Sequence, residues 1–95
     1  MPVIWKFPFS VTDAQTVLLP TGARALHVDD QRGILGELAL WALVSDPDAA
    51  LEPRAVRVVG TGRARDDLTF DDYVGTVLQQ GLIWHVFVSR GVFGR

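Results

Sequence analysis

Two copies of the dipeptide Gly-Thr are the residues best suited to bind a phosphorylated ligand. They occur in Gly60-Thr61-Gly62 and in Gly75-Thr76, at or beside predicted strands. Glycine lets a ligand approach the backbone closely, and the threonine hydroxyl can hydrogen-bond a phosphate oxygen or a base edge. Arg57, Arg63 and Arg65 lie near the first copy, and guanidinium groups bind phosphate through paired hydrogen bonds. These residues predict a phosphate pocket. A glycine turn beside solvated arginines would also explain them, because no Walker or dinucleotide fingerprint is present.

Aromatic residues provide the second element of a nucleotide site, because a nucleobase stacked on an aromatic ring gains ~1–3 kcal/mol. Trp5 and Tyr73 lie near the ends of predicted strands, and we expect them to be free of the core. The other aromatic residues, Trp84 among them, could also stack on a base, but a core or subunit interface explains most of them better. His85 lies between Trp84 and Val86, where its ring can contact a ligand or be satisfied within a sheet.

These residues form one candidate ligand-binding set. The arginines and Thr61 are assigned to phosphate or ribose, the aromatic members to base stacking, and His85 to a polar contact. The full set is Arg57, Thr61, Gly62, Arg63, Trp5, Tyr73, Thr76, Trp84 and His85.

Metal-binding and catalytic patterns receive little support. His27 with Asp29 and Asp30 resembles a fragment of a metal site, but the second histidine is far away in the sequence. The aspartates between residues 66 and 72 lack EF-hand spacing and fit a solvated acidic turn. The chain has no cysteine nucleophile and no Gly-x-Ser-x-Gly sequence. We therefore expect no metal, no cofactor and no enzymatic activity, with a small nucleotide-signal hydrolase as an alternative.

The composition fits one domain, residues 1–95, with an excess of apolar surface. Of the 95 residues, 48% are hydrophobic and three are tryptophan, whereas a chain of this size buries only ~60–65% of its unfolded surface. We expect a homo-oligomer, a dimer or tetramer, with a compact monomer as the alternative. The absence of cysteine excludes disulfides and fits a reducing cytoplasm.

Charge and hydropathy narrow the range of partners. The formal net charge is −2, and a nucleic-acid coat needs many basic phosphate contacts, so we expect no nucleic-acid polymer. The longest apolar region, near residues 38–44, is too short to span a membrane. The start of the chain lacks the pattern of a targeting leader. A cytoplasmic protein without a membrane partner is expected.

Turn residues divide the chain at short intervals and predict a mainly β fold, a small antiparallel sandwich or barrel of short strands. Residues 35–43 also fit a helix, which leaves a β-rich α+β fold as the alternative. Two β-branched and aromatic runs flank Gln80-Gly81 and predict a β-hairpin. The expected strands are residues 3–7, 16–19, 24–29, 38–44, 54–59, 73–78 and 82–89.

Alternation within these strands predicts which side chains point inward. Leu26 and Val28 are expected to face the core, and Arg54 is expected to share a face with two valines. Residues 82–88 are apolar on both faces, so we expect them to be covered on both sides, by another layer or another subunit. Residues 66–72 predict a turn or one helical turn with an aspartate N-cap, and residues 90–95 a loosely ordered tail.

The ordered set of motifs resembles a family of short proteins that are common in phage and prophage genomes. It is also similar to the phage anti-CBASS sponge proteins, which are small oligomers that bind cyclic-nucleotide immune signals. The resemblance covers nearly the whole chain up to Ser89. It rests on Val3-Ile-Trp-Lys-Phe-Pro8, Leu40-Trp-Ala-Leu-Val44 with Asp46-Pro47, Arg57-Val-Val-Gly-Thr-Gly62, Tyr73-Val-Gly-Thr-Val77 and Trp84-His-Val-Phe87.

The resemblance implies an immune-evasion protein that sequesters a cyclic di- or oligonucleotide without cleaving it. Sequestration needs no catalytic residues, and symmetric subunit interfaces could form shared pockets. A signal present at micromolar levels would require a nanomolar Kd, about −12 kcal/mol. The acidic net charge provides no long-range attraction for such a ligand. The alternative is a small structural or assembly protein of a phage that associates with itself and binds no nucleotide.

Overall fold

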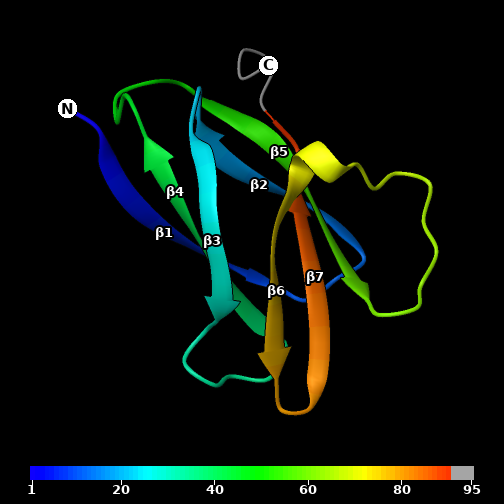
Figure 1. Cartoon of the computed structure of the whole chain (residues 1–95). Coiled ribbons are helices and arrows are strands. Elements are labelled where there is room, and N and C mark those ends of the chain that lie inside the picture. The colour runs from blue at the N-terminus through cyan, green and yellow to red at the C-terminus, as the bar shows by residue number, and fades with distance from the viewer. Residues whose placement is uncertain (91–95) are drawn as a thin grey trace.

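The structure, a computed structural model, describes residues 1–90 of the chain. Two antiparallel sheets pack face to face as a small β-sandwich (Figure 1), which confirms the predicted fold class. One sheet has the strand order β1-β4-β3 and the other has the order β2-β5-β7-β6. The strands are β1 (Val3–Ser10), β2 (Ala14–Pro20), β3 (Arg24–Asp30), β4 (Glu37–Val44), β5 (Leu51–Gly60), β6 (Tyr73–Gln79) and β7 (Leu82–Val88).

β4 is the central strand of the three-stranded sheet, and its segment is the one that also fitted a helix. Leu38, Leu40 and Val44 are fully buried in the core. Trp41 pairs with Lys6 of β1 and is half-buried on the outer face of the sheet. Side chains therefore alternate with the period of two that defines a strand, and the strand interpretation is confirmed.

β7 is an inner strand of the four-stranded sheet, between β5 and β6. The β6–β7 connection is the hairpin predicted at Gln80-Gly81, whose φ angles of 48° and 83° are those of a type I′ turn. Val86 and Val88 are buried against the other sheet. Within residues 1–90 no further layer covers the opposite face of β7. The expectation that another layer or subunit covers this face therefore stays a prediction.

β3 and β6 lie side by side along one edge of the sandwich, although they belong to different sheets (Figure 1). Their approach is close at Gly75, where a Cβ atom would lie 3.1 Å from Cγ2 of Val28. Both strands are irregular near this edge, with a register shift between Ala25 and His27 in β3 and another between Tyr73 and Gly75 in β6. β-Bulges bend strands in this way.

The bulge in β3 overturns one expectation. Leu26 was expected to face the core with Val28, but it is 47% exposed while Val28 is 2% exposed. The extra residue in the bulge shifts the alternation by one position, so that Ala25 packs against the core in place of Leu26. His27 and Asp29 are exposed, as predicted.

The segment before β6 contains a short 3-10 helix, Phe70–Asp72. The prediction of one helical turn is confirmed, but the aspartate N-cap is wrong. Thr69 holds the cap position in an extended conformation and makes no side-chain capping hydrogen bond. Asp71 and Asp72 lie within the short helix itself.

The core lies between the two sheets, and its central side chains come from both of them. Three polar side chains are buried, with Gln79 at one end of the four-stranded sheet and Arg54 and Glu52 towards the other. None of the helices within residues 1–90 is long and apolar enough to cross a membrane. The predicted tail falls mostly on residues 91–95, which lie outside the described residues. The buried apolar residues of the core cluster are Phe9, Leu19, Ala23, Val28, Leu38, Leu40, Val44, Val56, Val58, Val77, Val86 and Val88.

Candidate functional site

A chain of hydrogen bonds runs across the outer face of the four-stranded sheet, with His85 at its centre. The Nε2 atom of His85 lies 2.8 Å from the hydroxyl oxygen of Thr61, and its Nδ1 atom lies 3.0 Å from that of Thr76. The hydroxyl of Tyr73 is 2.5 Å from the same Thr76 oxygen. Both ring nitrogens of His85 are therefore bonded to hydroxyl groups, which fixes the plane of the ring.

The strand register explains why these residues meet. His85 of β7 is directly opposite Thr76 of β6 and Val59 of β5, and residues opposite each other in antiparallel strands point to the same face. Thr61 follows β5 in a turn closed by a hydrogen bond from the Arg63 amide to the Gly60 carbonyl. Gly62 has a φ of 88° in this turn, a conformation that glycine adopts without strain.

The same face carries two aromatic rings and an arginine. Phe87 is opposite both Tyr73 and Arg57 in the register. The rings of Tyr73 and Phe87 meet edge to face with their centroids 5.4 Å apart, a favourable geometry for an aromatic pair. We call this group of side chains the His85 face; it consists of Arg57, Thr61, Tyr73, Thr76, His85 and Phe87.

Asp67 holds Arg57 in place on this face. The Arg57 Nε donates to Oδ2 of Asp67 at 2.7 Å, and Nε and Nη2 of Arg65 donate to the same carboxylate at 3.0 and 2.8 Å. Hydrogen bonds from Arg65 and from Arg57 hold the pKa of the Asp67 carboxyl below its usual value. Two guanidinium groups thus share one carboxylate, which leaves one positive charge in excess at the edge of the His85 face.

Four residues of the predicted set are not part of the His85 face. Trp84 points to the inner side of β7 and packs against the core, and Trp5 belongs to β1 in the other sheet. Gly62 and Arg63 line a hollow of about 540 Å³ beyond the end of β5. The structure therefore brings together Arg57, Thr61, Tyr73, Thr76 and His85 of the predicted set. Gly62 and Arg63 remain next to them, in the turn that contains Thr61, whereas Trp5 and Trp84 lie away from this face.

Sequence reasoning missed two members of the site. Phe87 was placed in a core or interface, although its position two residues after His85 in a strand puts both side chains on one face. Asp67 was assigned to a solvated turn, and nothing in the sequence indicates that it folds back to Arg57. Asp67 lies in the loop between β5 and β6. The conformation of this loop cannot be predicted from a periodic pattern of apolar residues, as that of a strand can.

The suggested metal fragment does not form a cluster. His27 and Asp29 are both exposed, with Nε2 and Oδ2 3.8 Å apart. The His27 ring lies beside Trp41, with centroids 5.9 Å apart. Residues 1–90 contain no group of three or more histidine, cysteine or acidic side chains placed to hold a metal ion.

The fold and the His85 face define a small β-sandwich protein with a polar and aromatic surface on its four-stranded sheet. The chain belongs to the family of the domain of unknown function DUF7352, whose sequence profile matches residues 1–92. No curated protein and no solved structure matches the chain.

Proposed function

We propose that this protein binds a cyclic di- or oligonucleotide on the His85 face and sequesters it without cleaving it. The observation that carries the proposal is the hydrogen-bonded chain from Thr61 through His85 and Thr76 to Tyr73. It presents fixed hydroxyl and imidazole groups beside an aromatic pair, which is the combination that a nucleotide requires.

Each part of a nucleotide has a partner of matching chemistry on this face. The Tyr73 and Phe87 rings offer a surface for a base, and Tyr73 is 44% exposed. The threonine hydroxyls and His85 can hydrogen-bond ribose or a base edge. A phosphate would approach Arg57, where the guanidinium groups of Arg57 and Arg65 outnumber the single carboxylate of Asp67.

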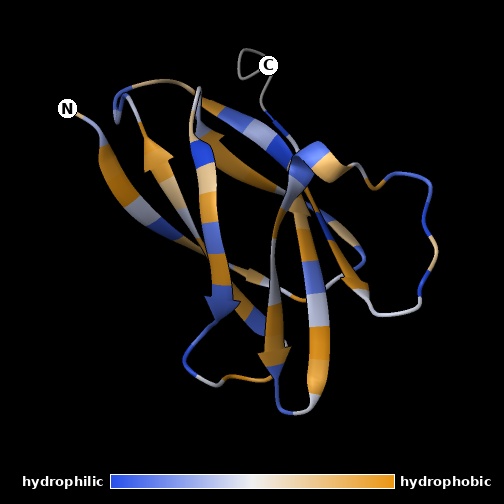
Figure 2. Cartoon of the chain, in the orientation of Figure 1, coloured by the Kyte–Doolittle hydropathy of each residue, from blue (hydrophilic) through white to orange (hydrophobic). Residues whose placement is uncertain are grey.

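A homo-oligomer is part of the proposal, because the His85 face is open. A nanomolar site normally encloses most of its ligand, whereas the hairpin beside this face exposes 69% of Leu78 and 46% of Ile83. Figure 2 shows that both strands of the β6–β7 hairpin are apolar next to the turn, whereas the turn itself is not. A second copy packed on these side chains would bury them and enclose the ligand.

The cellular setting follows from the resemblance to phage sponge proteins. We propose that the protein acts in the cytoplasm of a phage-infected host, where it competes with bacterial effectors for the signal. Binding without turnover suffices for this role, provided that the Kd lies near the nanomolar range, about −12 kcal/mol.

The direct test is a calorimetric titration of the full chain with a panel of cyclic di- and trinucleotides, followed by chromatography of ligand released on heating. The proposal predicts nanomolar binding of at least one member and recovery of the unchanged nucleotide. Recovery of a cleaved nucleotide would make the protein a hydrolase. The absence of binding across the panel would contradict the proposal.

The second candidate function is a structural or assembly protein that associates with itself. The exposed apolar end of the β6–β7 hairpin favours it, because contiguous apolar surface of this kind marks interaction sites. This function predicts self-association that is independent of nucleotide, and it would stand if the titration shows no binding.

A further inference from the structure

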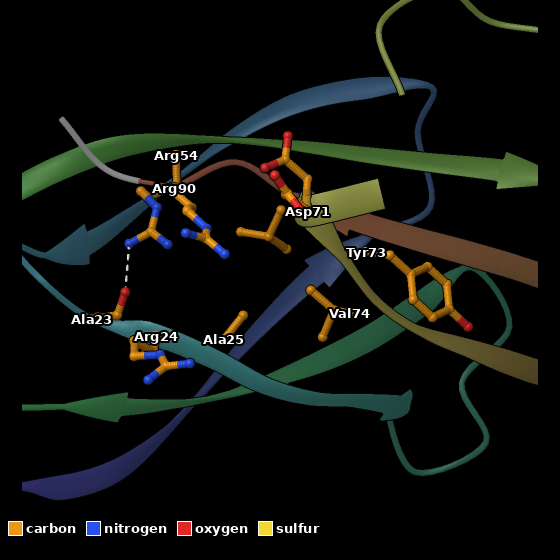
Figure 3. A pocket seen from close by; sticks show the side chains of 10 residues that line it. Ala23, Arg24, Ala25, Arg54, Asp71, Tyr73, Val74 and Arg90 are labelled. Atoms are coloured by element: carbon orange, nitrogen blue, oxygen red, sulfur yellow. Dashed lines mark hydrogen bonds between the residues drawn. The ribbon is translucent and has the colours of Figure 1, made fainter. Parts of the chain in front are cut away.

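A second hollow lies between the two sheets at the end where β3 and β6 begin, and it shares one lining residue, Tyr73, with the His85 face. Its volume is about 430 Å³, and its lining comes from the starts of β3 and β6, from β5 and from the end of β7. Figure 3 shows guanidinium groups and carboxylates gathered around it, with the alanine and valine side chains below. Its charged members are Arg24, Arg54, Arg90, Asp71 and Asp72.

Arg54 is the buried member of this group. It is 3% exposed and lies on the inner face of β5. Its Nε donates to the Ser89 carbonyl at 2.5 Å, and its Nη1 donates to the Ala23 carbonyl at 2.8 Å. Its Nη2 has no hydrogen-bond acceptor among residues 1–90, and the side chain borders the hollow.

Gln79, the buried polar residue at the other end of the sheet, has a hydrogen-bond partner for each polar atom of its side chain. Gln79 donates to Asp30, Ile34 and Glu37 and accepts a hydrogen bond from the Gly36 amide. All the polar atoms of Gln79 are thereby bonded. Arg54 differs because its Nη2 amino group makes no hydrogen bond within residues 1–90 and stays accessible from the hollow, where it can donate to a ligand.

The charges around the hollow limit what can bind there. Arg24 and Arg90 are exposed at the rim, and neither makes an ion pair with an acidic side chain among residues 1–90. Glu52 lies 3.6 Å from Arg54 behind the hollow. The three arginines are balanced by Glu52, Asp71 and Asp72, so the surroundings favour an anion with a single charge over one with two.

We propose that this hollow binds a singly charged oxyanion, a carboxylate or a phosphodiester group, on the free amino group of Arg54 with Arg24 and Arg90 at the rim. Guanidinium groups bind such oxygens with charge-assisted hydrogen bonds. Tyr73 lines this hollow and also belongs to the His85 face. Arg24, Arg54 and Arg90 take no part in the His85 face, so variants of these arginines test this site without altering the proposed nucleotide site.

The test is an NMR titration of the 15N-labelled full chain with sodium acetate and with sodium dimethyl phosphate, each compared with sodium chloride at equal ionic strength. The expected result is a saturable shift of the backbone amides near residues 23–25, 71–74 and 88–90. A response to acetate alone identifies a carboxylate site, and a response to dimethyl phosphate alone a phosphodiester site. Shifts no larger than those in chloride would overturn the proposal.

Two variants separate binding from the structural role of Arg54. Because replacement of Arg54 itself threatens the fold, the rim is changed instead, as Arg24→Gln with Arg90→Gln. We expect the affinity for the responding anion to fall by about tenfold or more, since two charge-assisted contacts are lost. Arg32→Gln removes the same type of charge from the exposed loop between β3 and β4 and should leave the affinity unchanged. Equal affinities in the rim variant and the wild type would contradict the proposed site.

Discussion

At the scale of single residues, buried and exposed arginines of this chain make different interactions. Arg54 lies in the sandwich interior and connects the end of β7 to the residue before β3 through two carbonyl groups. Burial lowers the pKa of its guanidinium, while the charges of Glu52 and Asp72 act in the opposite direction. Arg57 lies at the surface and is oriented by Asp67. We therefore expect Arg54 to contribute to stability, whereas Arg57 is accessible to the ligand that we propose for the His85 face.

Replacement of Arg54 by methionine should destabilise the fold by about 3–5 kcal/mol, because Glu52 would become an unpaired buried charge. Urea unfolding measures this loss. The double variant Glu52→Leu with Arg54→Met removes both charges and should regain a large part of the stability. A single variant that loses less than about 1 kcal/mol would contradict the role assigned to this pair.

The ion pairs of Asp67 should make a small, pH-dependent contribution to stability. The folded pKa of Asp67 is below its unfolded value of about 3.9, so the contribution is complete above that value and is lost as the pH falls through the folded pKa. An NMR titration of the side-chain carboxyl should show the depressed pKa. In the Arg65→Gln variant the pKa should move back towards the unfolded value; an unchanged pKa would contradict the assigned cause.

At the scale of elements, the strands and the hairpin could be predicted because local chemistry determines them. The Gln80-Gly81 turn, the alternation within β5 and the β-branched and aromatic run of β7 are visible in the sequence. The side of the sheet to which Leu26 points could not be predicted from the sequence, because the bulge in β3 arises from the pairing of β3 with β4. The burial of Arg54 was equally hidden, since its acceptors are backbone carbonyls distant in sequence.

The contact between β3 and β6 depends on the absence of a side chain at position 75. Gly75→Ala should destabilise the protein by about 1–3 kcal/mol, because the new Cβ would lie 3.1 Å from Cγ2 of Val28 and overpack the edge. Denaturant unfolding provides the measurement. Combining Gly75→Ala with Val28→Ala makes room for the new methyl group, so the two losses should be less than additive. Strict additivity would show that the two residues do not interact.

At the scale of the whole molecule, the four-stranded sheet combines the polar His85 face with an apolar hairpin end. Five of the nine candidate residues lie together on the His85 face, because strand register places the threonine, histidine and tyrosine on one side of the sheet. Trp84 packs against the core instead, because aromatic character alone does not determine to which side of a strand a ring points. Self-association through the hairpin end would complete an otherwise open site.

Self-association can be measured by analytical ultracentrifugation of the wild type and two variants. We expect an oligomer for the wild type and a monomer for Leu78→Gln with Ile83→Gln, because these side chains supply exposed apolar area on the hairpin. Leu51→Gln alters a similarly exposed leucine at the start of β5 and should leave the oligomer intact. A monomeric wild type at micromolar concentration would contradict the proposed assembly.

The measurement that tests the central claim most directly is the nucleotide affinity of Thr76→Val beside that of Thr16→Val. Both threonines are exposed strand residues of the four-stranded sheet, and only Thr76 bonds His85 and Tyr73. For the cyclic nucleotide that the wild type binds, calorimetry should show about tenfold weaker binding by Thr76→Val, since one or more hydrogen bonds are lost. Thr16→Val should bind as the wild type does. Equal affinities in the two variants, or no nucleotide binding by the wild type, would contradict the claim that the His85 face is the ligand site.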